Sequence, residues 1–256
     1  MTLVKSFNVE KLSVKAFDTR KAMGKCAVED AVKIIRELLK EKKELNFIFA
    51  AAPSQNELLE SLSLYKDIEW ERINAFHMDE YAFLDYNAPQ RFGNFLKEKI
   101  FSKVNFKSVN YIDGNSMDLE KECKRYGKLL EDNIPDIVFM GIGENGHIAF
   151  NDPSVASFKD KYLVKVVELD AKCRNQQVND KCFSTIDDVP KHALTLTIPI
   201  LTSAKYIYCV VPGDTKSEAV KNTLEGEINE NCPASILRTH DNAVLYIDEN
   251  SGKFVL

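Results

Sequence analysis

The chain has 256 residues, 45% of them hydrophobic, and its 34 Lys+Arg against 39 Asp+Glu leave a formal net charge of −5 at pH 7. No global positive field therefore recruits nucleic acid or an anionic membrane, and an anionic ligand would need a local site. No apolar run approaches the ~18 residues of a membrane span, and the N-terminal residues lack the apolar stretch of a signal peptide. The six cysteines are widely spaced and form no C-x-x-C pair. This usage is typical of reduced thiols in a cytoplasmic protein, and neither a disulfide framework nor a zinc ribbon fits it.

Short apolar runs alternate with longer amphipathic segments along the chain. The predicted strands are Leu45–Ala52, Ile73–Met78, Asp136–Met140, Leu163–Leu169, Tyr206–Val211 and Ala243–Ile247. The predicted helices are Arg20–Lys42, Met117–Leu130 and Thr215–Leu224. Several strands lack polar alternation, which suits strands covered on both faces. The pattern predicts an α/β fold with a single doubly wound, mostly parallel sheet and helices on both faces, as in Rossmann-like proteins.

No linker, low-complexity tract or internal repeat interrupts this pattern, so residues 1–256 are expected to form one domain. In open α/β sheets, ligands bind where the C-termini of strands meet the following loops and helix N-termini. Four such places follow from the predicted strands, namely the segments after Ala52, Met78, Met140 and Val211.

The first and last of these strand ends lead into S/T-x-x-E capping boxes, Ser54-Gln-Asn-Glu57 and Thr215-Lys-Ser-Glu218. Both boxes predict the start of a helix, and free amides at a helix N-terminus attract phosphate. Lys216 falls in the first turn of its predicted helix, where a positive charge disfavours the helix by ~0.3–1 kcal/mol. A cation at that place makes sense if an anion binds beside it, so Ser54 and Lys216 are candidates for phosphate binding.

The second strand end carries two adjacent acids. Period-two alternation places Ala75, His77 and Asp79 on one face of the strand. Asp79 and Glu80 would each raise the other's pKa, and apolar surroundings would add to the effect. A carboxylate tuned in this way can abstract a carbon-bound proton, although an ordinary acidic turn that closes a strand explains the same pattern.

The third strand end, in the segment Asp136–Pro153, is rich in glycine. Gly141, Gly143 and Gly146 form a literal G-x-G-x-x-G, the dinucleotide-binding fingerprint. That fingerprint needs a helix after its third glycine, and Asn151-Asp152-Pro153 follows too soon for one. We therefore interpret the match as fortuitous, with glycines that let the backbone turn sharply and bring its amides close to a ligand.

His147 and Asp152 lie in the same loop. A histidine with a nearby carboxylate is the simplest general acid/base unit near neutral pH, because the carboxylate fixes the tautomer and stabilises the charged ring. An ordinary loop histidine and a turn aspartate are the simpler interpretation. A divalent ion held by His77, Asp79 and His147 is a weaker alternative. The sequence contains no Ser or Cys nucleophile-elbow motif, so nothing indicates a covalent nucleophile. The four strand ends together predict a phosphorylated small substrate, a carboxylate base and a His–carboxylate pair.

These residues resemble those of the glucosamine-6-phosphate deaminase/isomerase family, which shares its fold with the 6-phosphogluconolactonases. The resemblance runs from about residue 20 to the C-terminus. The segments that carry it are Met78–Tyr81, Gly141–Pro153, Val189–Thr195, Gly213–Lys216, Pro233–Leu237 and His240.

The resemblance implies aldose–ketose isomerisation of an amino-sugar 6-phosphate, above all glucosamine 6-phosphate, with loss of ammonia and with neither metal nor other cofactor. Asp79 matches the family's base at C2, and His147 matches the residue that opens the sugar ring. The expected catalytic set is Asp79, Glu80, Asn145, His147 and Asp152. The expected substrate- and phosphate-binding set is Ser54, Gln55, Gly143, Gly146, Arg174 and Lys216. The expected partner is the sugar phosphate alone, with neither nucleic acid nor membrane, and the sequence leaves a homo-oligomer open.

The chain departs from the family pattern at several positions. The phosphate loop is Ala51–Gln55, where the family has a Gly- and Thr-rich sequence, and Asp152 stands where better-known members have Glu. Arg174 is the nearest counterpart of the family's phosphate-binding arginine, within a segment that aligns poorly. The run Ala149–Pro153 replaces the Ser-Leu-Phe-Pro-like run that is typical of lactonases and so favours the deaminases. A 6-phosphogluconolactonase and an inactive sugar-phosphate-binding protein remain the alternatives.

Overall fold

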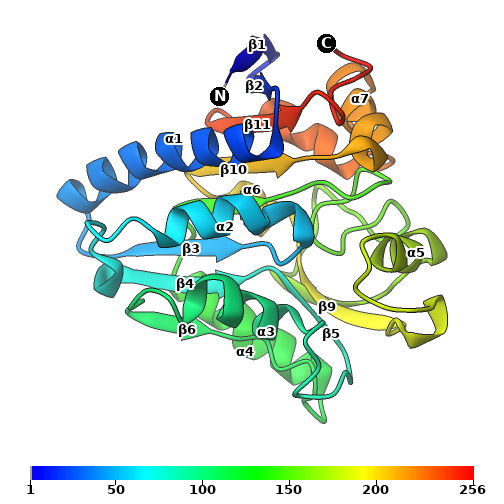
Figure 1. Ribbon diagram of the computed structural model, residues 1–256. Helices are drawn as coiled ribbons and strands as arrows, with labels where there is room; N and C mark the ends of the chain where they lie inside the picture. The colour runs from blue at the N-terminus through cyan, green and yellow to red at the C-terminus, as the bar shows by residue number, and fades with distance from the viewer. Residues whose placement is uncertain (1) are drawn as a thin grey trace.

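The computed structural model describes residues 2–256, and its centre is an eight-stranded sheet in the order β1-β2-β11-β10-β7-β3-β4-β6 (Figure 1). These strands are β1 Leu3–Val9, β2 Leu12–Phe17, β3 Leu45–Phe49, β4 Ile73–His77, β6 Ser108–Asn110, β7 Ile137–Met140, β10 Tyr206–Val211 and β11 Ala243–Asp248. Every neighbouring pair in this sheet is parallel except the β1–β2 hairpin. The prediction of a mostly parallel α/β sheet is confirmed.

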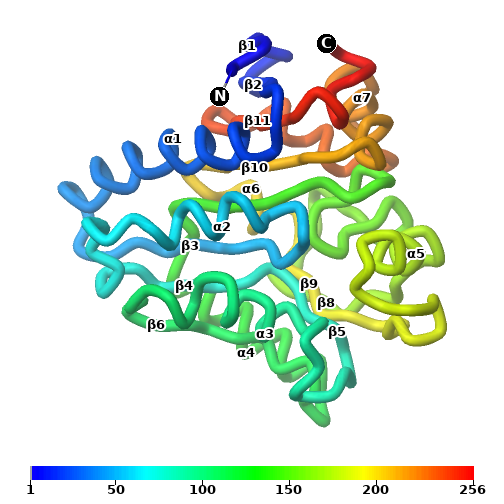
Figure 2. Tube along the Cα trace, in the orientation of Figure 1, coloured from blue at the N-terminus to red at the C-terminus, as the bar shows by residue number. Residues whose placement is uncertain are grey.

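Helices cover both faces of the sheet. They can do so because successive strand residues point to opposite faces and are apolar on each face. Phe47 and Phe49 of β3 pack into one buried cluster together with the first two helices, whereas Ile48 packs into the cluster on the opposite face. Figure 2 shows α1 and α2 crossing the same face of the sheet. The helices are α1 Arg20–Glu41, α2 Asn56–Ser63, α3 Phe92–Leu96, α4 Leu119–Asp132, α5 Ala171–Asn179, α6 Ile198–Thr202 and α7 Ser217–Glu225. Within residues 2–256, no helix has the length and apolarity to cross a membrane.

A second, three-stranded antiparallel sheet lies beside the main one, in the order β5-β9-β8. Its strands are β5 Asp79–Tyr81, β9 His192–Leu196 and β8 Val164–Glu168. The predicted strand Leu163–Leu169 therefore exists but belongs to this small sheet, so its assignment to one doubly wound sheet was wrong. The chain leaves the main sheet after His77 and enters the small sheet at Asp79, which places Asp79 at the junction of the two sheets.

The two predicted capping boxes are wrong. Helix α2 begins at Asn56 after a 3₁₀ turn, Pro53–Gln55, and α7 begins at Ser217 after the 3₁₀ turn Asp214–Lys216. At none of these starts does a side chain accept a hydrogen bond from the first turn. In each case the tighter turn precedes the helix and moves its start beyond the predicted capping residue. The side chains of Ser54 and Thr215 are consequently not used as helix caps.

The strand order has a switch point between β3 and β7. From β3 the sheet continues through β4 and β6 on one side, and from β7 it continues through β10 and β11 on the other. Since all these strands are parallel, their carboxyl ends lie at one edge of the sheet. Ligands of open α/β sheets bind in the crevice outside such a switch point.

Candidate active site

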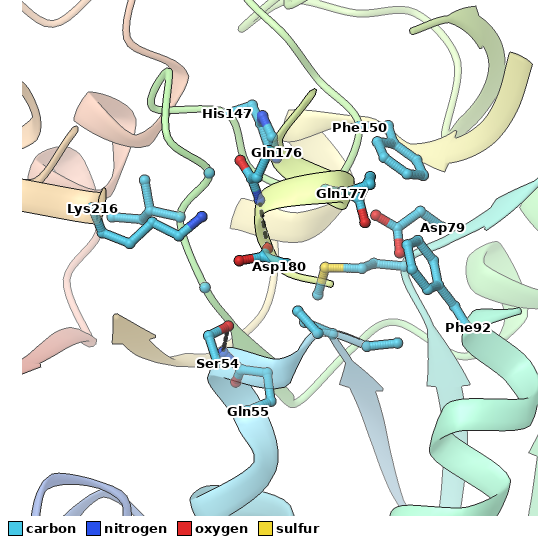
Figure 3. Close-up of a pocket in the computed structure, with 18 residues that line it drawn as sticks. Ser54, Gln55, Asp79, Phe92, His147, Phe150, Gln176, Gln177, Asp180 and Lys216 are labelled. Atoms are coloured by element: carbon cyan, nitrogen blue, oxygen red, sulfur yellow. Dashed lines mark hydrogen bonds between the residues drawn. The ribbon is translucent and has the colours of Figure 1, made fainter. Parts of the chain in front are cut away.

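A cavity opens at this edge, and all four predicted strand ends contribute to it (Figure 3). The segment after β3 contributes Ala50, Ala51, Ala52, Ser54 and Gln55; the others contribute Met78, Asp79, Gly141, Ile142, Gly143, His147 and Lys216. Two aromatic side chains, Phe92 and Phe150, and three residues of the α5 region, Gln176, Gln177 and Asp180, line it too. Figure 3 shows Lys216 and Asp79 approaching from opposite sides, with Asp180 and Gln176 between them.

Asp79 is a buried carboxyl group in this cavity, only 7% exposed. Burial raises its pKa well above the ordinary value, and the charge of Glu80 adds to the rise. The backbone of Asp79 is held by His77, whose Nδ1 lies 2.8 Å from the Asp79 carbonyl oxygen. A carboxyl group with a raised pKa binds a proton readily, which suits a group that takes a proton from carbon and returns it.

His77 itself is fully buried beside the cavity and is committed to the backbone. The amide of Ile112 donates to its Nε2 at 2.9 Å, so Nδ1 carries the proton that is donated to the Asp79 carbonyl. Burial lowers its pKa to about 4, and the ring is neutral at pH 7. Because both ring nitrogens are occupied, the metal site that combines His77, Asp79 and His147 does not form.

Glu80 is not among the described residues that line the cavity, although its neighbour Asp79 is. The Glu80 carboxylate accepts hydrogen bonds from the amides of Tyr81, Phe92 and Gly93 at 3.0–3.1 Å, and Arg91 lies 3.7 Å away. Burial raises its pKa, and these donors oppose the rise. The geometry thus gives Glu80 a bracing role at the start of α3, in contrast to the catalytic role that its position in the sequence suggested.

His147 is held by two other predicted residues. Its Nδ1 lies 2.7 Å from Asn145 Oδ1 and 2.9 Å from Asp152 Oδ1, and Asn145 Nδ2 donates to the same Asp152 oxygen at 2.9 Å. Since Nδ1 faces two acceptor oxygens it carries the proton, and Nε2 keeps the lone pair of the neutral ring. Burial acts to raise the pKa of Asp152, but the contacts with His147, Asn145 and Cys173 outweigh it, and the net shift is downward. The pair can therefore exchange a proton through Nε2 with a group in the cavity.

The glycine loop makes room for this histidine. A Cβ atom on Gly143 would lie 2.2 Å from the His147 ring, so any side chain there collides with it. Gly146 has φ +84°, and a Cβ would lie 2.7 Å from Cys232 Sγ. Gly146 shapes the loop from outside the cavity. No helix follows it within the described loop before Pro153, which confirms that the dinucleotide fingerprint is fortuitous.

The other end of the cavity combines one cation with hydrogen-bonding groups. Lys216 is 5% exposed and, of the described residues that line the cavity, it is the one lysine or arginine. Burial lowers its pKa, and the charges of Asp180 and Glu144 oppose the fall. Gln55 donates to Ser54 Oγ and to the carbonyl of Val210 at 3.1–3.2 Å. This end can receive an anion through the lysine, the Ser54 hydroxyl and the adjacent loop.

Arg174 lies outside the cavity, contrary to the expectation that it binds phosphate. Its guanidinium donates to the carbonyls of Ile186 and Val189 at 2.5–3.0 Å and ties α5 to the segment that follows it. The residues of this region that do reach the cavity, Gln176, Gln177 and Asp180, were missed by the sequence analysis. Helix α5 has few apolar residues, and its one clear signal is Asp170, whose side chain caps the helix by accepting from the Cys173 amide at 2.7 Å.

Within residues 2–256 one group of side chains has the spacing of metal ligands, namely His147, Asp152 and Cys173, whose ligand atoms lie within 4.8 Å of one another. The donor set does not fit a metal well. Asp152 already holds His147 through Oδ1, and the same ring nitrogen, Nδ1, also faces Asn145 Oδ1 at 2.7 Å.

The family model for glucosamine-6-phosphate isomerases/6-phosphogluconolactonase matches residues 18–246. The chain is 33% identical over 223 residues to glucosamine-6-phosphate deaminase of Bacillus cereus (strain B4264), with 87% of this chain and 83% of the relative covered. The deaminase of Bacillus cytotoxicus is 33% identical over 228 residues, with the same coverage. Among solved structures, a monomeric glucosamine-6-phosphate deaminase superposes with a TM-score of 0.83 at 32% identity, covering 94% of this chain and 98% of that one. A 6-phosphogluconolactonase from Thermotoga maritima shares the fold at TM-score 0.75 and 21% identity, covering 92% and 98%.

Gly143→Ala should displace the His147 ring. The added Cβ atom would lie 2.2 Å from the His147 ring, so either the ring or the loop must move. We expect the free energy of unfolding to fall by about 1–3 kcal/mol. Urea denaturation measures the loss, and a crystal structure of the variant locates the ring. Gly127→Ala is the matched control, because a Cβ there meets only Leu163 at 3.8 Å. Equal stability of the Gly143 variant and the wild type would contradict the packing described.

Asp79→Asn should stabilise the fold at alkaline pH. Because burial raises the pKa of Asp79, folding favours its protonated form, and the free energy of unfolding of the wild type falls as pH rises through the raised pKa. An asparagine has no such cost, so the advantage of the variant should be absent at low pH and grow to on the order of 1 kcal/mol or more at high pH.

Urea denaturation from about pH 3.5, below the pKa of an unfolded-state aspartate, to pH 9 follows this difference. Asp187→Asn, at an exposed position, is the control. A pH-independent difference between Asp79→Asn and the wild type would show that the Asp79 carboxyl is not destabilised by burial.

Proposed function

The chain belongs to the family of glucosamine-6-phosphate isomerases and 6-phosphogluconolactonases, and we propose that it is a glucosamine-6-phosphate deaminase. The reaction isomerises the aldose amino sugar to a ketose and takes up water, with release of ammonia and fructose 6-phosphate. The observation that carries the proposal is that Asp79, with its raised pKa, and His147, which Asp152 holds from behind, line one cavity that ends at Lys216.

Asp79 is the proposed base that moves a proton between C2 and C1. Taking a proton from carbon requires a carboxylate that is a stronger base than an exposed one, and burial together with Glu80 supplies this property. The hydrogen bond from His77 holds the Asp79 backbone, and Phe92 and Phe150 exclude water on that side of the cavity. The base then acts on a substrate in apolar surroundings, where its charge is poorly screened.

His147 is the proposed group that opens the sugar ring. Its Nε2 takes a proton from the hydroxyl at C1 of the sugar. The imidazolium then donates a proton to the oxygen of the sugar ring as the bond between C1 and that oxygen breaks. Asp152 and Asn145 keep the proton on Nδ1 through contacts of 2.7–2.9 Å, and Asp152 stabilises the ring while it is charged. Glu80 acts on this chemistry only through the pKa of Asp79, and Arg174 positions the segment that follows α5.

The phosphate is proposed to bind at the opposite end of the cavity. Lys216 supplies the positive charge, Ser54 a hydroxyl, and Gln55 holds Ser54 in place through a contact of 3.2 Å. The loop around Gly143 lets the backbone approach the ligand closely. We further propose that residues 1–256 act as a single domain and that the protein is cytoplasmic, since the described cysteines are all free. The solved deaminase that it resembles is described as monomeric.

Purified protein incubated with glucosamine 6-phosphate should release ammonia and fructose 6-phosphate in equal amounts. Asp79→Asn should lose turnover and exchange of the C2 proton with solvent by at least ~100-fold, because general acid–base catalysis contributes about that much. Both are measured by coupled ammonia assay and by NMR in deuterium oxide. Asp187→Asn, which changes an exposed acid in the same way, should match the wild type.

Hydrolysis of 6-phosphogluconolactone is assayed in parallel. Fast lactone hydrolysis without release of ammonia would contradict the deaminase activity and indicate a 6-phosphogluconolactonase. Binding of the sugar phosphate without turnover of either substrate would indicate a sugar-phosphate-binding protein.

Removing the charges at the phosphate end should change KM in opposite directions. Lys216→Gln removes the cation that faces the phosphate and should raise KM about tenfold or more with a smaller effect on kcat. Asp180→Asn removes an acid whose charge acts on Lys216, and it should lower KM for the sugar phosphate. Steady-state kinetics at two ionic strengths measure both.

Lys221→Gln, on the exposed side of α7, is the control for the lysine variant. An unchanged KM in Lys216→Gln would show that the phosphate does not bind beside Lys216. A raised KM in Asp180→Asn would mean that Asp180 binds the substrate directly.

A further inference from the structure

One oxygen of the buried Asp152 carboxylate has no partner in the mechanism described. Asp152 is 0% exposed, and its Oδ1 is shared between His147 and Asn145. Its Oδ2 is buried and has no hydrogen-bond partner among the described residues. A buried carboxylate oxygen without a donor costs free energy, and a carboxylate held on one side only can rotate. The thiol of Cys173 lies near this carboxylate: it is 1% exposed, and its Sγ lies within 4.8 Å of one Asp152 carboxylate oxygen and of one His147 ring nitrogen.

The position of Cys173 is fixed by its backbone. Cys173 lies in the first turn of α5, where the Asp170 side chain accepts from its amide at 2.7 Å. The next residue, Arg174, ties the helix to the carbonyls of Ile186 and Val189. The Leu169 amide donates to the Lys191 carbonyl at 2.8 Å, which anchors the chain just before the helix. These contacts hold the Cys173 side chain against Asp152.

We propose that Cys173 is a positioning residue whose thiol donates a hydrogen bond to Asp152 Oδ2 and thereby keeps Oδ1 on His147. The proposal rests on the proposed function, in which His147 opens the sugar ring. A thiol is a weak donor, but its proton is retained here because burial and the charges of Asp152, Asp170 and Asp79 all raise its pKa. The same interaction is one of those that lower the pKa of Asp152, beside His147 and Asn145.

Helix α5 would then serve two purposes. Gln176 and Gln177, one turn further along the helix, line the cavity, and the Gln176 side chain accepts from the Glu144 amide at 2.8 Å, in the loop that carries His147. The helix that lines the cavity therefore also orients the acid/base pair. The segment that aligned poorly in the sequence holds the histidine loop in place.

Three variants separate donation from packing. Cys173→Ser keeps a donor in a smaller side chain. Cys173→Val and Cys173→Ala remove the donor, the first with a larger side chain and the second with a smaller one. We expect the serine variant to retain at least half of the wild-type kcat and the donor-free variants to lose about fivefold or more, with KM within twofold. Without the donor the Asp152 carboxylate takes up a proton at higher pH, so the acid limb of kcat should move to higher pH in these two variants only.

Cys123→Val, at a buried cysteine of α4 remote from the cavity, is the control and should leave the pH profile unchanged. Thermal midpoints of all variants show whether each is folded, and alanine replaces valine if the larger side chain prevents folding. If Cys173→Val has the kcat of the wild type and Cys173→Ser has a lower one, the proposal is overturned. Packing alone would then explain why a cysteine at position 173 supports activity.

A readout without turnover keeps this test apart from the proposed function. Long-range ¹H–¹⁵N correlation spectra of the imidazole nitrogens, assigned through His147→Gln, report the tautomer of His147. The wild type and Cys173→Ser should show the proton fixed on Nδ1, and the donor-free variants should show a mixture of tautomers. If the wild type is inactive on glucosamine 6-phosphate, the function fails but the spectra still decide; identical spectra in all variants would overturn the positioning role.

Discussion

The parallel pairing of β10, β7, β3 and β4 is the constraint on which the site depends. Parallel neighbours bring their carboxyl ends to one edge of the sheet, so segments far apart in the sequence must meet there. The Ser54 loop, Asp79, the His147 loop and Lys216 each follow one of these four strands and together line one cavity. No single segment contains the site, and a change of register in one strand would separate the base from the acid/base pair.

The site also depends on carboxyl groups whose pKa values shift in opposite directions. Asp79 and Asp152 are both buried, and burial favours the protonated form of each. Asp79 has another acid as its neighbour, so its pKa stays high. Asp152 has His147, Asn145 and Cys173 as donors, and its pKa falls below the ordinary value despite burial. One carboxyl group in the cavity and one buried behind His147 can therefore act as base and as charged support at the same pH, a division that the surroundings set.

Sequence patterns predicted the parts of this arrangement that depend on local periodicity. The run Leu45–Ala52 and its counterparts show apolar residues on both sides, which is what a central parallel strand requires, and their ends located Ser54, Asp79, His147 and Lys216. The direction of Glu80 could not be predicted in this way, because the chain leaves the main sheet after His77 and the strand period no longer continues. Strand β5 has three residues and helix α5 has few apolar ones, so neither carries a periodic signal, and only tertiary contacts place Gln176 and Asp180 in the cavity.

The net charge of −5 and the single lysine in the cavity together limit how a sugar phosphate can be bound. A phosphate that carries two negative charges meets one buried ammonium group, and Asp180 acts on the same lysine. Since the cations that the fold could have supplied, Arg91 and Arg174, are paired with Glu80 and with backbone carbonyls, uncharged groups must complete the site. The Ser54 hydroxyl and the amides of the loops after β3 and β7 are such groups, and they recognise the geometry of the phosphate rather than its charge. The affinity of this cavity for phosphate then depends on how rigidly the loops around Ser54 and Gly143 are positioned. The hydrogen bonds of Gln55 position the first loop, and the packing of His147 against Gly143 positions the second.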